Sequence, residues 1–106
     1  MNKEKLRIKL LNALSDETRL RILTHLRHGN ELCACDLDRF FDKSQSTLSR
    51  HLKKLEEADL IKGRKDGVKM FYKIKDPQIF KLLAVLDNLI KRNKKFKEII
   101  EIQKNI

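Results

Sequence analysis

Long apolar runs are missing from this sequence, and so are the residue patterns of an enzyme. No stretch approaches the ~20 consecutive apolar residues that a bilayer-spanning helix needs, so we expect no membrane partner. Residues 1–5 lead into a charged amphipathic segment without the apolar core or cleavage site of a signal peptide, which favours the cytoplasm. No Ser-His-Asp arrangement, glycine-rich phosphate loop or spaced carboxylate pair is evident, so we expect no catalytic activity.

Cysteine is scarce as well, with only Cys33 and Cys35, and this excludes a scaffold of several disulfides. In a cytoplasmic protein such a pair is more often reactive or metal-binding than a structural disulfide. Two other interpretations stay open. Both residues can be small buried hydrophobes, the commonest fate of free cysteine, or they can form a reversible disulfide, although so short a ring is strained.

Positive charge is abundant and unevenly placed. The 106 residues carry 25 basic and 15 acidic side chains, a net charge of +10. Residues 43–75 hold ten of the basic and only four of the acidic side chains. A basic excess gathered in one segment is typical of a nucleic-acid footprint, although solvated lysine-rich helix faces give the same count.

The hydrophobic periodicity predicts a mainly α fold with a small β-hairpin. Helices are expected at about 3–14, from 16 to about Gly29, at 33–41 and at 44–58. The first has an apolar side of Leu6, Leu10, Leu11 and Leu14, and the third is expected to bury Leu37, Phe40 and Phe41. The last two, joined by a tight connection, make a helix-turn-helix at about 33–58. Alternating residues around Asp66-Gly67 predict a hairpin, or wing, at about 60–74.

A long apolar helix is predicted at 77–104, opened by Pro77. One small domain cannot cover so long an apolar face, and we expect this helix and the helix at 3–14 to dimerise with a second copy. The whole chain, 1–106, is then a single winged helix-turn-helix domain. A different class, a protein-interaction module that uses the last helix, stays open.

The helix at 44–58 places hydroxyl, amide and basic side chains opposite its leucine stripe. Gln45 can pair with adenine and Arg50 with guanine or phosphate, while hydroxyls serve base edges or phosphates. His51 either touches phosphate or packs in the core. The predicted DNA-binding residues are Gln45, Ser46, Thr47, Ser49, Arg50, His51 and Lys53 on the helix, with Arg64, Lys65 and Lys69 on the wing.

Four linked motifs occur in order along the chain: Leu14–Leu23, the Cys-x-Cys-Asp-Leu run within Glu31–Leu37, Ser44–Leu52 and the wing segment Arg64–Tyr72. Together they resemble the ArsR/SmtB metalloregulatory repressors, and most of all their arsenic-responsive branch. The resemblance implies a homodimeric winged helix-turn-helix repressor of its own operon. Double-stranded operator DNA is then its partner, and binding it requires no cofactor.

The resemblance also implies an inducer that lowers DNA affinity, with As(III) or Sb(III) bound by Cys33 and Cys35 and other thiophilic ions as alternatives. Some arsenic sensors carry a third cysteine three residues after the second, where this chain has Asp38. The family's alternative zinc ligands are missing, since residues 76–106 contain no histidine.

The spacing of the two thiols predicts how an ion would act. Positions i and i+2 of an α-helix point about 200° apart, so binding by both thiols is expected to distort the first turn of the helix. The alternatives are a winged-helix regulator that uses the thiols as a redox sensor and a regulator whose cysteines are structural.

Overall fold

The computed structural model describes residues 1–105, which fall into two units, Met1–Asp76 and the segment from Pro77 onward. Ile106, the last residue of the predicted domain, lies outside the described residues. The first unit contains the helices α1 (Lys3–Leu14), α2 (Glu17–His25), α3 (Ala34–Leu37) and α4 (Gln45–Glu57), a short 3₁₀ turn at Arg27–Gly29, and the strands β1 (Leu32–Cys33), β2 (Ile61–Asp66) and β3 (Lys69–Ile74). The second contains α5 (Gln78–Arg92) and α6 (Lys94–Lys104).

Helix α4 begins and ends where its sequence dictates. The Ser44 side chain accepts a hydrogen bond from the Thr47 amide and caps the first turn. Leu48, Leu52 and Leu55, at i, i+4 and i+7, are all buried, so one stripe of the helix faces the core of the first unit. This confirms the predicted helix and leaves its other faces for solvent.

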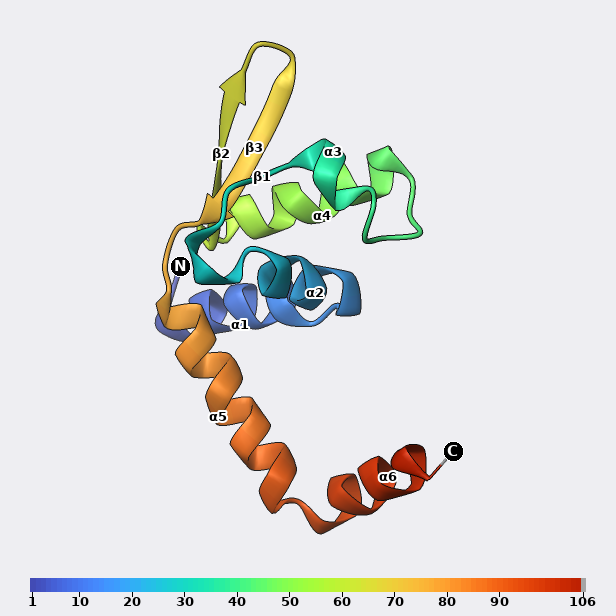
Figure 1. The fold of residues 1–106 in the computed structure, drawn as a ribbon. Coiled ribbons are helices and arrows are strands. Elements are labelled where there is room, and N and C mark those ends of the chain that lie inside the picture. Colours follow the sequence, from blue (N-terminus) through green and yellow to red (C-terminus); the bar gives the residue numbers. More distant parts are fainter. Residues whose placement is uncertain (106) are drawn as a thin grey trace. The chain divides into compact units, whose positions relative to one another are not determined.

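The predicted hairpin is also confirmed, and it extends away from the helices of its unit (Figure 1). Asp66 pairs with Lys69 across a two-residue loop, and Gly67 takes the first loop position with φ +63°. A type II′ turn takes glycine at this position because a side chain there is strained. Together, α3, α4 and the hairpin form a winged helix-turn-helix.

A third strand joins this sheet. β1 pairs antiparallel with β3, with Leu32 opposite Tyr72 and Cys33 opposite Phe71, so the strand order is β1-β3-β2. The predicted two-stranded hairpin is therefore part of a three-stranded sheet. A strand of two residues has no alternating pattern from which it could be read, and only its partner defines it.

Helix α3 is shorter than the predicted helix at 33–41. After Leu37 the chain continues in turns, with the Arg39 amide bonded to the Asp36 carbonyl and that of Phe40 to the Leu37 carbonyl. Leu37 and Phe41 are buried as expected, whereas Phe40 is 46% exposed. The Phe40 ring stacks on His25 with the ring centroids 4.3 Å apart, so aromatic contact at the surface replaces the predicted burial.

Helix α2 starts as predicted and ends early. Asp16 caps it by accepting from the Arg19 amide over 3.0 Å. The α-helix stops at His25, and His28 and Gly29 then adopt left-handed conformations with φ +72° and +75°. The expected end at Gly29 is thus reached through a 3₁₀ turn.

The second unit is broken where one long helix was predicted. Asn93 has extended backbone, ends α5 and caps α6 by accepting from the Phe96 amide over 3.1 Å. Both helices carry exposed apolar side chains, which include Leu82, Val85, Leu86 and Leu89 on α5 and Phe96, Ile99, Ile100 and Ile102 on α6. No helix within residues 1–105 is long and apolar enough to cross a membrane.

Candidate functional site

Cys33 has two structural roles, because it is the last residue of β1 and the N-cap of α3. Its backbone is extended (φ −68°, ψ 145°), and its sulfur accepts from the Cys35 amide at 3.3 Å. The Cys33 amide donates in return to Asp36 Oδ2 at 3.1 Å, which completes a capping box. The strand and the helix therefore meet at one thiol-bearing residue.

The two cysteine sulfurs lie together, and this corrects the predicted helical geometry of the pair. Cys33 lies outside the helix, so the separation of about 200° for helical positions i and i+2 does not apply. The structure joins Cys33 and Cys35 as a disulfide, with 5.1 Å between their Cα atoms. No unwinding of α3 is needed to bring both sulfurs to one ligand.

Access to the pair is one-sided, since Cys33 is 4% exposed and Cys35 is exposed. A pocket of about 140 Å³ adjoins Cys35 between α3 and α4, and its other lining residues are Ala34, Asp38, Gln45, Leu48, Ser49 and Leu52. Asp38 is occupied there, because Gln45 Nε2 donates to its Oδ2 over 2.9 Å. The turn after α3 is thereby tied to the first residue of α4.

The pair offers two soft ligands for an ion, and the described part of the chain offers no ready third. Across residues 1–105, no group of three or more His, Cys, Asp or Glu side chains is arranged to hold a metal. Thiolates suit thiophilic ions, and the donor set fits such an ion if another ligand comes from outside the chain.

The outer face of α4 matches the chemistry expected of a DNA-reading helix. Its exposed predicted residues are Gln45, Ser46, Ser49, Arg50 and Lys53. Thr47 is half-buried, and its hydroxyl accepts from Ser44 at 2.9 Å and from Arg50 Nη2 at 3.4 Å. The hydroxyl of Thr47 therefore serves the start of the helix and the placement of Arg50.

His51 points inward from the same helix. Arg19 Nη1 donates to its Nδ1 over 3.0 Å, and Asp16 Oδ2 lies 3.7 Å from that nitrogen. Burial lowers the pKa of His51 below its usual 6.5, nearby cations lower it further, and Asp16 opposes them. A neutral ring accepts the bond from Arg19, so the geometry supports packing over phosphate contact.

The three predicted wing cations differ in their surroundings. Lys65 and Lys69 are exposed near the hairpin tip, whereas Arg64 is held by Glu31. Arg64 Nε lies 3.0 and 2.9 Å from the two Glu31 oxygens, and Nη2 lies 2.6 Å from Oε1. The Arg64 hydrogen bond lowers the pKa of Glu31 below its usual 4.5. Sequence reasoning missed Glu31, because its partner is 33 residues away.

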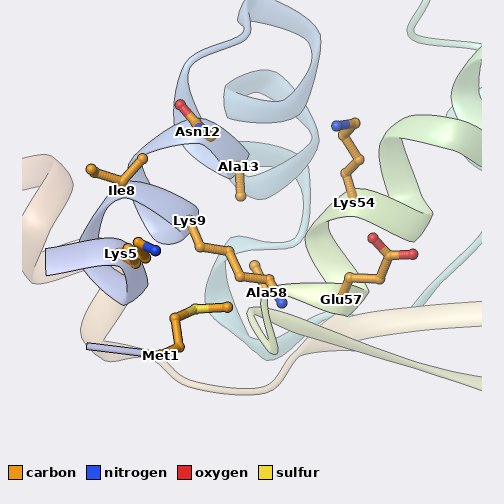
Figure 2. Close-up of a pocket in the computed structure, with 9 residues that line it drawn as sticks. All are labelled: Met1, Lys5, Ile8, Lys9, Asn12, Ala13, Lys54, Glu57 and Ala58. Carbon is orange, nitrogen blue, oxygen red and sulfur yellow. The ribbon is translucent and has the colours of Figure 1, made fainter. Parts of the chain in front are cut away.

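A larger pocket of about 460 Å³ lies between α1 and the end of α4, and its lining includes Lys5, Ile8 and Lys9 of α1 and Lys54 and Glu57 of α4 (Figure 2). Met1, Asn12, Ala13 and Ala58 complete its lining. Neither cysteine nor histidine is among these nine residues, so the pocket offers a thiophilic ion no soft ligand. It is separate from the thiol pair and from the outer face of α4.

Comparison with known proteins gives consistent matches. Residues 16–62 match the family described as bacterial regulatory protein, arsR family. An arsenical resistance operon repressor of Staphylococcus aureus is 46% identical over 81 residues, which are 76% of this chain and 70% of that protein. The cadmium resistance regulatory protein CadC of Listeria innocua is 41% identical over 72 residues, which are 68% of this chain and 60% of that protein.

The fold has a counterpart among solved structures. The solution structure of a homodimeric winged helix-turn-helix DNA-binding domain from Mycobacterium bovis, a possible ArsR-family regulator, superposes with a TM-score of 0.72. The match covers 85% of this chain and 82% of that one at 21% identity, which supports the fold alone.

Proposed function

The chain belongs to the ArsR family of bacterial regulatory proteins, and from that premise we propose that it is a cytoplasmic, homodimeric repressor released from operator DNA by a thiophilic ion, As(III) or Sb(III) first among them. Membership in a family of regulators agrees with the expectation that the chain is not an enzyme. The observation that carries the proposal is the adjacency of the Cys33 and Cys35 sulfurs one connection before the DNA-reading helix.

The DNA surface is the outer face of α4 together with the wing. Gln45 is proposed to read adenine, Arg50 to bind guanine or phosphate, and the hydroxyls of Ser46, Thr47 and Ser49 to bind base edges or phosphates. Lys53, Lys65 and Lys69 are exposed and add attraction to phosphates that weakens with salt. His51 acts by packing against Arg19.

The inducer site is proposed to be the reduced Cys33–Cys35 pair. By analogy with zinc–sulfur bonds of about 2.3 Å, an ion held by both thiolates separates the sulfurs to at most about 4 Å. That separation moves Cys35 against the pocket it shares with Asp38 and Gln45. Because Asp38 accepts from Gln45, the displacement reaches the first residue of α4, where DNA contact is proposed.

The third ligand is proposed to come from a cellular thiol or from solvent. Asp38 stands where some arsenic sensors have a cysteine, but its hard carboxylate is a poor partner for a soft ion and is already bonded to Gln45. Asp38→Ala is therefore expected to leave inducer affinity nearly unchanged.

The exposed apolar faces support a homodimer. Helix α1 leaves Leu6, Leu10 and Leu11 between 43% and 56% exposed, although they were predicted to form its apolar side. Helices α5 and α6 leave larger apolar sets exposed in their own unit. We propose that a second copy of the chain covers both sets, in line with the prediction that the helices at 3–14 and 77–104 dimerise.

A redox sensor is the second candidate, and the disulfide between Cys33 and Cys35 supports it. In that case, an oxidant such as peroxide takes two electrons and two protons from the thiol pair, the disulfide forms with release of water, and DNA is released. The two candidates use the same residues and differ in the signal that releases DNA, which is ion binding in the first and oxidation in the second.

Fluorescence anisotropy of operator DNA with the reduced protein tests both candidates. We expect arsenite to release wild-type protein under a phosphine reductant, with Cys33→Ser and Cys35→Ser still bound to DNA. Serine at 33 keeps the cap of α3, so the first variant removes the thiol but preserves the fold. Release by peroxide, added after the phosphine is removed, but not by arsenite supports the redox sensor. Release of a Cys33→Ser/Cys35→Ser double variant at wild-type arsenite concentrations contradicts ion sensing by the pair, and its release at wild-type peroxide concentrations contradicts the redox role.

A further inference from the structure

One row of the sheet joins the thiol pair to the wing. Cys33 of β1 lies opposite Phe71 of β3, and Phe71 lies opposite Arg64 of β2. Directly opposed residues of antiparallel strands share a face of the sheet. Glu31, two residues before Cys33, falls on the same face by the two-residue period of extended chain. The Glu31 carboxylate, close in sequence to the thiol pair, thus meets the Arg64 guanidinium of the wing.

Arg64 is fixed from two sides. Its guanidinium lies over the Phe71 ring at 4.8 Å, and Glu31 receives both its Nε and its Nη2 at 2.6–3.0 Å. A planar guanidinium held by a carboxylate fork and an aromatic face has lost most of its rotational freedom. The Arg64 side chain is still 54% exposed, and its remaining nitrogen, Nη1, lies 3.8 Å from Asp66. The group is therefore oriented without being enclosed.

The geometry points to Glu31 as a positioning residue that presents Arg64 to a DNA phosphate and passes the state of the thiol pair to the wing. This inference rests on the proposed function and adds a second path beside the one through Asp38 and Gln45. A pre-oriented arginine loses less freedom when it binds phosphate than a freely rotating one. A shift of residues 31–33 on ion binding moves Glu31, and Arg64 then loses its alignment.

Glu31→Gln separates positioning from simple electrostatics. The substitution makes the protein more positive by one charge, so charge alone predicts tighter DNA binding. Positioning predicts the opposite sign. We expect operator affinity to fall about three- to tenfold, the scale of one charge-assisted contact. We also expect the slope of log affinity against log salt to decrease by about one unit, since one phosphate contact is lost.

Asp66→Asn is the matched control. Asp66 is the other carboxylate near Arg64, but it lies on the wing itself and not beside the thiols. Asp66 is paired with Lys69 and precedes the two-residue loop, whose first position is Gly67, so asparagine at 66 leaves both loop residues unchanged. We expect this variant to bind DNA as tightly as wild type or more tightly, and to keep the full response to arsenite.

Arg64→Lys tests whether Glu31 acts through Arg64. Lysine keeps the charge but loses the fork and the aromatic stacking. We expect the double variant Glu31→Gln/Arg64→Lys to bind DNA no more weakly than Arg64→Lys alone. Additive losses mean that Glu31 acts elsewhere and overturn the inference. The same comparison controls for reduced stability of Glu31→Gln. A general folding defect would add its loss of DNA affinity to the loss caused by Arg64→Lys.

The arsenite arm distinguishes this inference from the proposed function. We expect Glu31→Gln to bind arsenite as wild type does, measured by the absorbance of the arsenic–thiolate bonds. We also expect a smaller ratio of the DNA affinity without arsenite to the DNA affinity with arsenite. If wild type itself does not respond to arsenite, the proposed function fails, and the affinities without arsenite still test Glu31. If Glu31→Gln binds DNA no more weakly than wild type and keeps the wild-type ratio, the relay is wrong and the function stands.

Discussion

Arg19 donates from its guanidinium to Nδ1 of His51 over 3.0 Å, and this bond joins α2 to α4, the helix proposed to read DNA. Arg19 is only 9% exposed, and it also donates to the carbonyls of Ala13 at 2.7 Å and Asn12 at 3.0 Å. One buried side chain thus holds the end of α1 and the middle of α4 to the start of α2.

Removing that side chain should be costly. We expect Arg19→Met, which keeps much of the apolar stem, to lower the free energy of unfolding by about 3 kcal/mol, since two carbonyls and a ring nitrogen lose their donor. Arg7→Met is the control, because Arg7 is exposed and its one ion pair within residues 1–105 is with Glu4 on its own helix. Its cost should stay below about 1 kcal/mol. Urea unfolding at fixed protein concentration measures both, and equal costs would refute the anchoring role of Arg19.

The depressed pKa of His51 predicts how stability depends on pH. Burial holds this pKa below 6.5, so the unfolded chain binds the proton more readily than the folded one. Stability is therefore fully present above about pH 6.5 and is lost as the pH falls through the lower pKa of the folded state. His51→Gln should flatten this part of the profile. The pKa of Asp16 is also lowered, by the hydrogen bond from the Arg19 amide above all. The stability that ionised Asp16 contributes is therefore lost at more acidic pH, below 3.8. A wild-type profile unchanged by His51→Gln would contradict the assignment.

Gly63 should resist a substitution that strands normally favour. A Cβ at this position would lie 2.8 Å from Tyr72 Cε1 and 3.1 Å from Met70 Cε. We expect Gly63→Ala to lower the free energy of unfolding by about 1–3 kcal/mol through overpacking, although glycine usually weakens a strand. In a Tyr72→Val background the same substitution should cost much less, because the ring is gone. Thermal unfolding of the four proteins measures the difference, and equal costs in both backgrounds would exclude the clash.

Arg50 and Lys65 should affect DNA binding in different ways. If Arg50 pairs with a base, Arg50→Ala should cost about 1–3 kcal/mol on the operator and relax sequence preference at one position per half-site. Lys65→Ala should weaken operator and random duplexes alike and reduce the salt slope by about one unit. Anisotropy titrations on both duplexes at several salt concentrations separate the roles. Equal losses of Arg50→Ala on both duplexes would assign Arg50 to phosphate.

Local signals predicted the parts of the fold that local interactions build. Helix α4 follows from its leucine spacing and the Ser44 cap, and the hairpin follows from its alternation around Gly67. The break at Asn93 was missed because the apolar pattern continues across it. Only the extended backbone of Asn93, whose side chain caps α6, marks the break.

Contacts between distant residues were beyond the reach of the sequence. The pairing of β1 with β3, the Glu31–Arg64 ion pair and the Arg19–His51 bond each join segments more than 30 residues apart. The sequence placed both thiols at the start of the helix that precedes α4, but it did not predict the relative geometry of the two sulfurs. It depends on Cys33 being extended, which β1 imposes through its pairing with β3.

The cap formed by Cys33 separates its proposed role in sensing from its role in folding by a single atom. A sulfur holds the position that serine oxygen fills in ordinary helix caps, and it accepts the same kind of amide bond. Exchange of that sulfur for oxygen leaves the backbone with an equivalent partner and removes a thiolate ligand. If Cys33 senses the inducer as proposed, one codon change at residue 33 therefore switches that response on or off without a cost in folding that selection would first have to repair.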